Sequence, residues 1–204
     1  MPDVKDGQTR SLREERAAVT RGRITDAARR LFRARGYGAT TLTDVAREAG
    51  VAVQTVYAVY RSKSGILRAL RESVLRQPEA EALFDQALRE PRADMKLDLF
   101  ARSIRRRWEY GADVVAIHRD AATADRAVRA EVDMILTIRR ASIGRLARSL
   151  DDVQVADIDV KRATAILDAL TLPEVYLELI DVQGWTPDEF EAWLGRSLRQ
   201  QLRG

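Results

Sequence analysis

Two short apolar patterns on either side of Gly50 constrain the fold of this chain more than any other feature. Residues 42–49 repeat apolar side chains at the spacing of one helical face, and residues 53–60 do so again after the glycine. Glycine accepts the positive φ that a tight corner needs, and Ala46 is small enough for two helices to cross closely. The sequence therefore predicts two short helices joined by a turn. The side chains predicted to brace this pair are Val45, Ala49, Val51, Val56 and Val59.

One helix is predicted before this pair and another after it. The apolar residues of the first recur at intervals of three and four until Gly36, which ends the helix. Thr41 and Asp44 match a capping box at the start of the second helix, and Ser62 is suited to cap the fourth. The apolar stripe of the first helix consists of Ile24, Ala27, Ala28, Leu31 and Phe32.

The third helix of this unit presents side chains suited to reading DNA. Gln54, Thr55 and Tyr57 can bond to base edges or touch a thymine methyl group in the major groove, and Gln54 is the best base-reading candidate. Thr41 and Lys63 lie at helix N-termini, where they can meet phosphate. The alternative is a unit that only packs or docks a protein. The predicted DNA-binding residues are Arg23, Thr41, Gln54, Thr55, Tyr57, Tyr60 and Lys63.

Positive charge is concentrated in the same part of the chain. Residues 1–75 hold 15 Lys and Arg against 8 Asp and Glu, whereas residues 76–204 hold 20 against 23. A basic unit of this kind suits a polyanion. Residues 1–19 are predicted to form a flexible arm, because the first fourteen are polar and lack an apolar period. Arg21 and Arg23 beside it either contact DNA or are merely solvated.

The composition indicates helix almost everywhere, since Ala, Leu, Arg and Glu dominate and only 5 prolines are present. Helices are expected near residues 79–90, 93–110, 113–122 and 126–150, followed by a loop over 151–159. Pro173 is expected to interrupt the next helix, and Thr186 with Glu189 predicts a capped final one. The predicted fold is all-α, with a helix-turn-helix domain over residues 20–66 and a helical ligand-binding and dimerisation domain over 67–204.

The chain lacks cysteine and has a single histidine, His118. This excludes disulfides and thiolate metal sites, and the absence of neighbouring ligands argues against a metal at His118. We expect no cofactor. No apolar run approaches the roughly 20 residues that span a bilayer, and the N-terminus is too charged for a signal peptide. A cytoplasmic protein is therefore expected, nucleoid-associated when bound to DNA and without a membrane partner.

The predicted C-terminal domain offers an apolar set with few polar groups, which is typical of small-molecule cavities. Each of these residues alone also fits an ordinary core. Three successive arginines, Arg105 to Arg107, point in different directions on a helix; a solvated face is the simple interpretation, and a clamp for an anionic ligand is the alternative. The candidate ligand-binding residues are Phe100, Ile104, Trp108, His118, Met134 and Tyr176.

The last two helices carry more apolar side chains than a monomer is expected to cover, which favours a homodimer face near Gly184. The alternative is that they complete the core of the protomer. A two-fold dimer would bind a palindromic operator. The candidate interface residues are Tyr176, Leu179, Phe190, Trp193, Leu194 and Leu198.

Residues 23–72 contain a series of short motifs. They are Ala27 and Ala28, Leu31 and Phe32, Gly36 and Tyr37, Thr40 and Thr41, Ala49 to Val51, Thr55 to Tyr57, and Lys63. With these motifs the segment resembles the DNA-binding domain of the TetR family of transcriptional regulators. The resemblance implies an Ω-shaped, all-helical homodimer with a four-helix interface and an effector pocket in its C-terminal domain. The sequence departs from the family pattern at Tyr60, where Phe is usual, and at Val59, where a polar residue often contacts the DNA backbone.

These features bear on three classes of function. The first is a repressor that binds double-stranded operator DNA and is released by a small-molecule effector. The second is a DNA-binding regulator or architectural protein without a ligand. A C-terminal domain without an enclosed cavity would favour this second class. An enzyme is disfavoured, because the sequence has no glycine-rich phosphate loop, nucleophile elbow or cluster of metal ligands.

Overall fold

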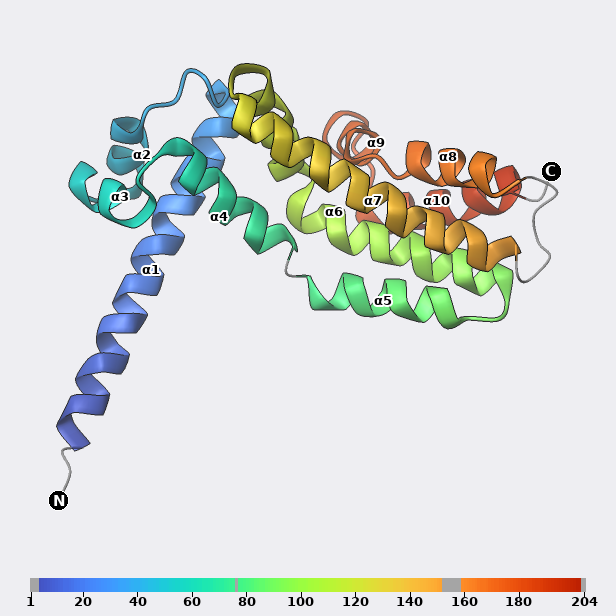
Figure 1. Ribbon diagram of the computed structural model, residues 1–204, viewed down its shortest axis with the longest axis horizontal. Helices are drawn as coiled ribbons and strands as arrows, with labels where there is room; N and C mark the ends of the chain where they lie inside the picture. The colour runs from blue at the N-terminus through green and yellow to red at the C-terminus, as the bar shows by residue number, and fades with distance from the viewer. Residues whose placement is uncertain (1–3, 76, 152–158, 203–204) are drawn as a thin grey trace. The chain divides into compact units, whose positions relative to one another are not determined.

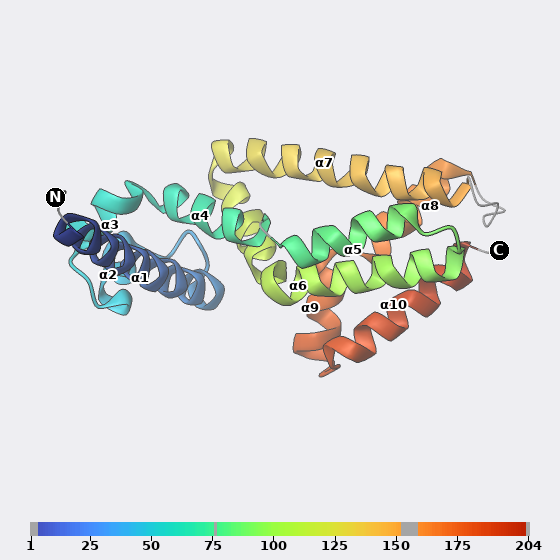
Figure 2. The same cartoon turned by 90° about the horizontal axis from the view of Figure 1, so that it is seen from below.

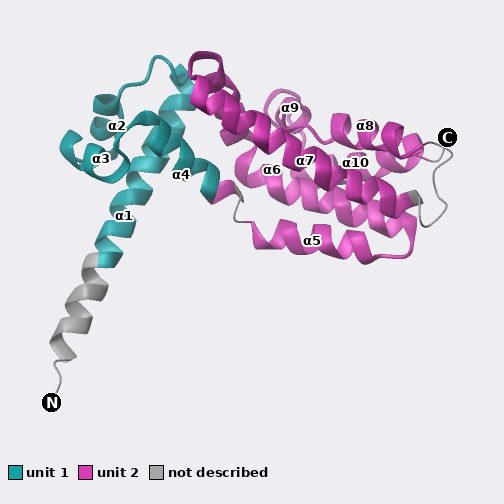
Figure 3. Ribbon diagram, viewed as in Figure 1, with its two compact units in different colours: residues 1–72 teal, residues 73–204 magenta. Residues whose placement is uncertain are grey.

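The computed structural model describes residues 4–75, 77–151 and 159–202. They divide into two compact units, Met1–Glu72 and Ser73–Gly204, which are coloured separately in Figure 3. Every regular element in the described ranges is a helix, which confirms the predicted all-α fold. None of these helices is both long and apolar enough to cross a membrane.

Unit 1 contains the three predicted helices and the beginning of a fourth. They are α1 (Val4–Arg35), α2 (Leu42–Ala49), α3 (Val53–Tyr60) and α4 (Lys63–Leu75), and Figure 1 shows α2 and α3 as a short pair packed beside α1. The capping box of Thr41 and Asp44 is present at the start of α2. The hydroxyl of Ser62 accepts a hydrogen bond from the amide of Gly65 at 3.1 Å, which confirms the predicted cap of α4.

The core of unit 1 follows the predicted apolar pattern with one correction. The five stripe residues of α1 are all buried, as are Val45, Ala46 and Ala49 of α2 and Val56 of α3. Val59 was expected to face inward and is 38% exposed instead. In the next turn of α3, Tyr60, four residues after Val56, is the side chain that packs inward. Val59 therefore faces solvent.

The N-terminal boundary of α1 differs from the predicted arm. Residues 1–19 were expected to lack an element, whereas the structure has helix from Val4 onward. Polar residues of good helix propensity extend a helix that the apolar stripe has already nucleated, even without burial of their own. The compact units divide after Glu72, a few residues later than the predicted boundary between 66 and 67.

Unit 2 is built around one long central helix. It comprises α5 (Pro78–Arg89), α6 (Ala93–Ala124), α7 (Arg126–Asp151), α8 (Val160–Leu170), α9 (Pro173–Leu177), the π-helical turn η1 (Glu178–Val182) and α10 (Pro187–Leu202). Helix α6 packs against α5, α7, α9 and α10, and Figure 2 shows α5 alongside it with α7 and α10 on opposite sides. Most of the loop predicted over 151–159 lies outside the described residues, but Asp159 is seen to cap α8.

The end of unit 2 has the helix break and the helix start that were predicted from the sequence. Pro173 separates α8 from α9, and the chain turns at Gly184, whose φ is 73°. Glu189 accepts hydrogen bonds from the amide and hydroxyl of Thr186 at 2.7 and 2.9 Å, so the capping box at the start of α10 is formed. These bonds lower the pKa of the Glu189 carboxyl, the backbone amide of Thr186 being the largest cause.

Most of the residues assigned to a dimer face belong to the core of unit 2. Phe190, Leu194 and Leu198 are 0% exposed and Tyr176 is 5% exposed, with the rings of Tyr176 and Phe190 in edge contact at 4.9 Å. Such residues have no surface left for a partner. The alternative of a completed core is therefore correct for these four. Of the six candidates, only Leu179 and Trp193 keep partly exposed side chains.

A buried lysine holds three helices of unit 2 together. Lys96 is 2% exposed, and its Nζ donates to the carbonyl oxygens of Ala87 and Leu88 at 3.0 Å each and to Oγ of Ser149 at 3.1 Å. The two carbonyl groups lie in the last turn of α5, where helical acceptors lack partners, and Ser149 lies on α7. Lys96 therefore joins α6 to both neighbours by hydrogen bonds in the interior.

Gly111 explains why α6 is continuous where two helices were predicted. Helices were predicted near 93–110 and 113–122, and Gly111 lies in the gap between them. In the structure, an added Cβ at Gly111 would lie 2.2 Å from Cγ1 of Val74 on α4. Val74 itself is 7% exposed and has little room to move. The glycine therefore serves a close helix approach and does not end the helix.

Gly111→Ala is expected to lower the free energy of unfolding by about 1–3 kcal/mol through overpacking, although alanine favours a helix. Val74→Ala should relieve the clash, so the double variant should be more stable than the sum of the single effects implies. Urea unfolding measures all three. Gly144→Ala on α7 is the matched control, since the contact there is an ordinary 3.6 Å to the end of Arg148, and it should be neutral or stabilising.

Candidate nucleic-acid interface

The corner between α2 and α3 is formed by Gly50 in the left-handed conformation. The φ and ψ angles of Gly50 are 65° and 42°. The amide of Val51, the next residue, donates a hydrogen bond to the carbonyl of Ala46 at 3.0 Å. Nη2 of Arg23 on α1 donates to the Gly50 carbonyl at 3.4 Å. The corner thus needs glycine for its backbone angles, and Arg23 connects it to α1. Contact of Arg23 with DNA stays a prediction.

Helix α3 is anchored on one side and open on the other. Val56 is fully buried, whereas Gln54 is exposed and Tyr57 is 53% exposed. Gln54 and Tyr57 are three residues apart, so they share the solvent-facing side of the helix. Thr55 is half-buried at the edge of this side. The three side chains expected to read DNA are therefore not absorbed into the core.

The end of α3 adds a residue that the sequence analysis missed. Arg61 caps the helix with φ 63° and ψ −37°, a backbone conformation that residues other than glycine rarely adopt. Its amide donates to the carbonyl of Tyr57 at 2.9 Å, and its side chain is exposed. A basic residue directly after the third helix is the sequence signal that could have indicated it. Arg61 is thus an exposed cation directly after α3.

Tyr60 and Lys63 have structural partners in the free protein. Lys63 Nζ donates to the carbonyl oxygens of Tyr37 and Gly38 at 2.7 and 3.3 Å and lies 4.5 Å from the centre of the Tyr37 ring. The hydroxyl of Tyr60 donates to the carbonyl of Arg21 at 3.2 Å, and burial raises its pKa. Both residues hold the ends of α3 and α4 against the rest of unit 1. Their contact with phosphate stays a prediction.

Thr41 orders the beginning of α2. Its hydroxyl accepts from the Asp44 amide at 3.1 Å and donates to Oδ2 of Asp44 at 2.6 Å. Hydrogen bonds from the side chain and then the backbone of Thr41 lower the pKa of Asp44, which also pairs with Arg47. The Asp44 carboxylate is thereby kept charged near the helix N-terminus, where the helix dipole favours it. Thr41 is exposed and remains able to approach DNA.

Comparison with known proteins identifies this unit. Residues 24–70 match the family model for bacterial regulatory proteins of the tetR family. The unit formed by these residues is of the tetR-family type. It is also 36% identical over 73 residues to YvkB of Bacillus subtilis, an uncharacterized HTH-type transcriptional regulator. That match covers 32% of this chain and only 39% of the relative. The comparisons thus identify residues 24–70 as a helix-turn-helix DNA-binding unit.

Solved structures of transcriptional regulators, one of them described as a TetR-family protein, share the fold over most of the chain. PfmR from Thermus thermophilus has a TM-score of 0.68 at 20% identity, covering 89% of this chain and 95% of PfmR. NalD, the secondary repressor of the MexAB-OprM multidrug efflux pump in Pseudomonas aeruginosa, has a TM-score of 0.67 at 23% identity, covering 92% and 98%. FadR from Bacillus subtilis in complex with stearoyl-CoA has a TM-score of 0.65 at 18% identity, covering 88% and 98%. Likeness at such identities concerns the fold alone.

The ligand candidates of unit 2 do not form one set. Phe100, Ile104, Trp108, His118 and Tyr176 are 1–6% exposed, whereas Met134 is 55% exposed and does not line an interior site with them. Met134 lies on the outer face of α7, a face that periodicity alone could not orient. Nε1 of Trp108 donates to the carbonyl of Thr171 at 3.1 Å, and Nδ1 of His118 lies 2.9 Å from the carbonyl of Val114. Phe100, Ile104, Trp108 and Tyr176 belong to the hydrophobic core of unit 2. Contact of any of these residues with a ligand stays a prediction.

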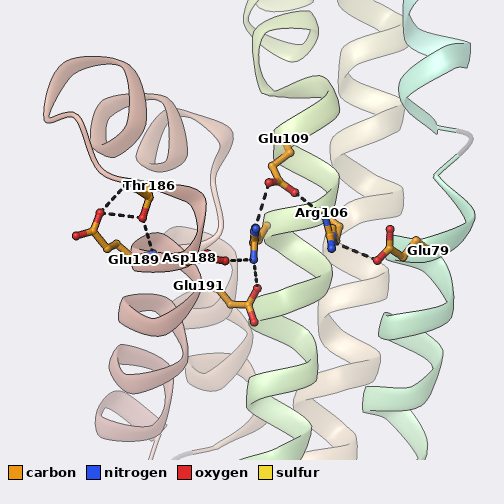
Figure 4. A network of polar contacts seen from close by, with 8 residues as sticks. Glu79, Arg106, Glu109, Thr186, Asp188, Glu189 and Glu191 are labelled. Atoms are coloured by element: carbon orange, nitrogen blue, oxygen red, sulfur yellow. Dashed lines mark hydrogen bonds and ion pairs between the residues drawn. The ribbon is translucent and has the colours of Figure 1, made fainter.

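Arg105 and Arg106 are engaged in a network that joins three helices (Figure 4). Arg105 lies 2.5 Å from Asp188 and 3.0 Å from Glu191, both on α10. Arg106 lies 3.1 Å from Glu79 on α5, and both arginines pair with Glu109. These pairs are half-buried at most, and they tie α6 to its neighbours.

An open depression of about 520 Å³ lies on unit 2 beside this network. It contains none of the predicted ligand residues. The residues that line it are Asp98, Asp188, Glu191, Ala192, Arg196 and Arg199.

Proposed function

We propose that this protein is a TetR-family repressor that binds a palindromic operator as a homodimer and is released by a small-molecule effector. The observation that carries the DNA-reading part is the open face of α3, where Gln54 and Tyr57 are exposed while Val56 anchors the helix. An HTH places such a face in the major groove. The proposed place of action is the cytoplasm, on the nucleoid when the operator is bound.

Half-covered apolar side chains at the end of unit 2 support a homodimer. Leu179, Ile180 and Trp193 pack only partly against the core, and Val182 is 67% exposed. On α8, Ile166 and Leu170 are also partly buried. An apolar surface of this kind is usually covered by a partner. The proposed interface is therefore α8 with the η1 and α10 region, and Leu179 and Trp193 are the two earlier candidates that remain in it.

Release by an effector is the least direct part of the proposal. Support comes from related folds, since FadR of Bacillus subtilis was crystallised with stearoyl-CoA. Such a ligand must favour a conformation that binds the operator less tightly. A second candidate, a regulator without a ligand, is favoured by one observation: five of the six predicted ligand residues are buried as core.

Selection of bound fragments from the DNA of the host tests the DNA-reading proposal. The expected result is a recurring sequence with two-fold symmetry, protected over two successive major-groove faces in a footprint. A recovered pool without a shared sequence, at a salt concentration where unrelated DNA is released, would contradict specific operator binding. Expression of a reporter from the selected site, with and without the protein, then distinguishes repression from activation.

Arg61→Gln is expected to weaken binding to operator and unrelated DNA alike, because a cation beside phosphate carries no sequence information. The dependence of log K on log salt should become shallower by about 0.9 for each phosphate that is no longer neutralised, or about twice that for a dimer. Fluorescence anisotropy at four or more salt concentrations measures this slope. Arg68→Gln, an exposed arginine on α4, is the charge-matched control. An unchanged slope for Arg61→Gln would remove Arg61 from the interface.

A further inference from the structure

The open depression on unit 2 is lined by α6 and α10, and almost all of its lining is charged. One lining residue, Asp98, belongs to α6, and five belong to α10, from Asp188 to Arg199. Every lining side chain except that of Ala192 carries a charge. The depression is therefore a polar site, in contrast to the apolar cavity that the sequence analysis predicted.

The end of the depression near the start of α10 has an excess of carboxylates. Oδ1 of Asp188 and Oε2 of Glu191 lie 2.5 and 3.0 Å from the same nitrogen, Nη1 of Arg105 (Figure 4). Arg105 and its neighbour Arg106 both pair with Glu109 as well. Three carboxylates thus share two guanidinium groups. Among the described residues, the second oxygens of Asp188 and Glu191 have no hydrogen-bond partner, so they can accept hydrogen bonds from a ligand.

The other end of the depression is positive. Arg199 forms an ion pair with Asp98 across the two helices, so these two charges cancel. Arg196 is exposed and, within the described ranges, makes neither an ion pair nor a hydrogen bond. Its guanidinium has five N–H donors and no acceptor. This end therefore has one cation that is available to a ligand.

Gly195 accounts for the pairing that leaves Arg196 as the available cation. An added Cβ at this position would lie 2.8 Å from Oδ1 of Asp98 and 3.6 Å from Nη1 of Arg199. The absence of a side chain thus lets α10 approach α6 closely enough for Asp98 and Arg199 to meet. Because Asp98 is engaged there, it does not neutralise Arg196.

We propose that this depression binds a small zwitterion whose ammonium group pairs with Asp188 and Glu191 and whose carboxylate group pairs with Arg196. The two ends call for opposite charges on one ligand. A simple cation would lie beside Arg196 and a simple anion beside the carboxylates, and such like-charge contacts are unfavourable. The volume of about 520 Å³ lies within the range of about 300–1,000 Å³ that is usual for small-molecule sites.

The spacing of the two ends limits the length of the ligand. Asp188 and Arg196 are eight residues apart on α10, which places their backbone positions about 12 Å apart. Three extended residues of a peptide span about 10 Å, so a short peptide with free ends matches this spacing better than a free amino acid does. The inference rests on the proposed effector function and names the chemical class of the effector.

Isothermal titration of the full chain with trialanine, N-acetyl-trialanine and trialanine amide, at low ionic strength, tests the assignment. Each blocked peptide keeps the body of trialanine and lacks one of its two charges. Trialanine should bind about 5-fold more tightly than either blocked peptide, which is the upper range for an ion pair at an exposed site. Affinity of trialanine equal to that of either blocked peptide, or no binding of trialanine at millimolar concentration, would overturn the proposal.

Arg196→Gln should weaken binding of trialanine by about 5-fold and leave binding of trialanine amide unchanged, because the amide has no carboxylate for Arg196. Arg196 is exposed and has no partner to leave behind, so urea unfolding should match the wild type. Arg148→Gln, an exposed arginine on α7 outside the depression, is the matched control and should bind trialanine normally. Equal effects of Arg196→Gln on trialanine and its amide would refute the contact.

Asp188→Asn is the reciprocal variant at the other end. It should weaken binding of trialanine by about 5-fold and leave binding of N-acetyl-trialanine unchanged, since that peptide has no ammonium group. The side chain of Asp188 is 84% exposed, so the core is not disturbed. Asp85→Asn, at an exposed position on α5, is the control. If Asp188→Asn weakened both peptides alike, Asp188 would not hold the ammonium group and the site would be rejected.

The outcome is distinguishable from failure of the proposed regulator. Operator selection uses the wild-type chain without any added peptide and reports on DNA binding alone. A symmetric operator with no binding of trialanine would reject this inference and leave DNA recognition standing. Binding of trialanine without a selected operator would do the reverse.

Discussion

Gln54→Ala is expected to lower the affinity for the selected operator by about 2–6 kcal/mol while leaving binding to unrelated DNA unchanged. Each bidentate contact between an amide side chain and a base contributes about 1–3 kcal/mol of discrimination, and a dimer carries two copies of Gln54. Gln54 is exposed on α3, has no charge, and is not needed by the core. Its removal should therefore affect sequence reading and not the electrostatic attraction to phosphate.

Anisotropy titrations with operator and scrambled duplexes at one fixed salt concentration measure this difference. Gln86→Ala, which removes an exposed glutamine from α5 in unit 2, is the control and should change neither affinity. Repeating the operator selection with Gln54→Ala should also relax the preference at one position in each half-site. Parallel losses on both duplexes would mean that Gln54 positions the backbone of DNA and reads no base.

The DNA-binding unit could be predicted from sequence because its determinants are local. The left-handed turn at Gly50, the capping box of Thr41 and Asp44 and the burial of Val56 all depend on residues within a few positions of one another. Local signals of this type fix helix boundaries and inward faces almost independently of the rest of the chain. The prediction that Val59 is buried was wrong because Val59 and Tyr60 are both at helical spacing from Val56. Only packing against α1 decides which of the two side chains is buried.

Unit 2 could be predicted as helical but not in its interior arrangement. The predicted gap between 93–110 and 113–122 is absent, and the reason for a glycine at position 111 lies on another helix, at Val74. Lys96 could not be recognised as a buried residue, since its partners Ala87, Leu88 and Ser149 come from two other helices. Helical periodicity identifies the buried face of a helix, but not the element that packs against that face.

Phe190→Ala is expected to lower the free energy of unfolding of unit 2 by about 3–5 kcal/mol without weakening subunit association directly. Phe190 is 0% exposed and contacts the rings of Tyr176 and Trp193 at 4.9 and 5.9 Å, so its truncation leaves a cavity inside the protomer. Trp193 lies on the same helix with a partly exposed side chain. Trp193→Asp should therefore act chiefly on the dimer, by placing a charge in the proposed apolar interface.

Urea unfolding at several protein concentrations, with sedimentation equilibrium on the same samples, separates these effects. Unfolding of a dimer depends on protein concentration, and that dependence should persist in Phe190→Ala and be lost in Trp193→Asp. Val182→Asp changes a side chain that is 67% exposed and tests the interface without the core contacts of Trp193. If Phe190→Ala alone produced a stable, folded monomer, the residue would belong to the interface after all. The side of α10 that carries Phe190 would then face the partner subunit.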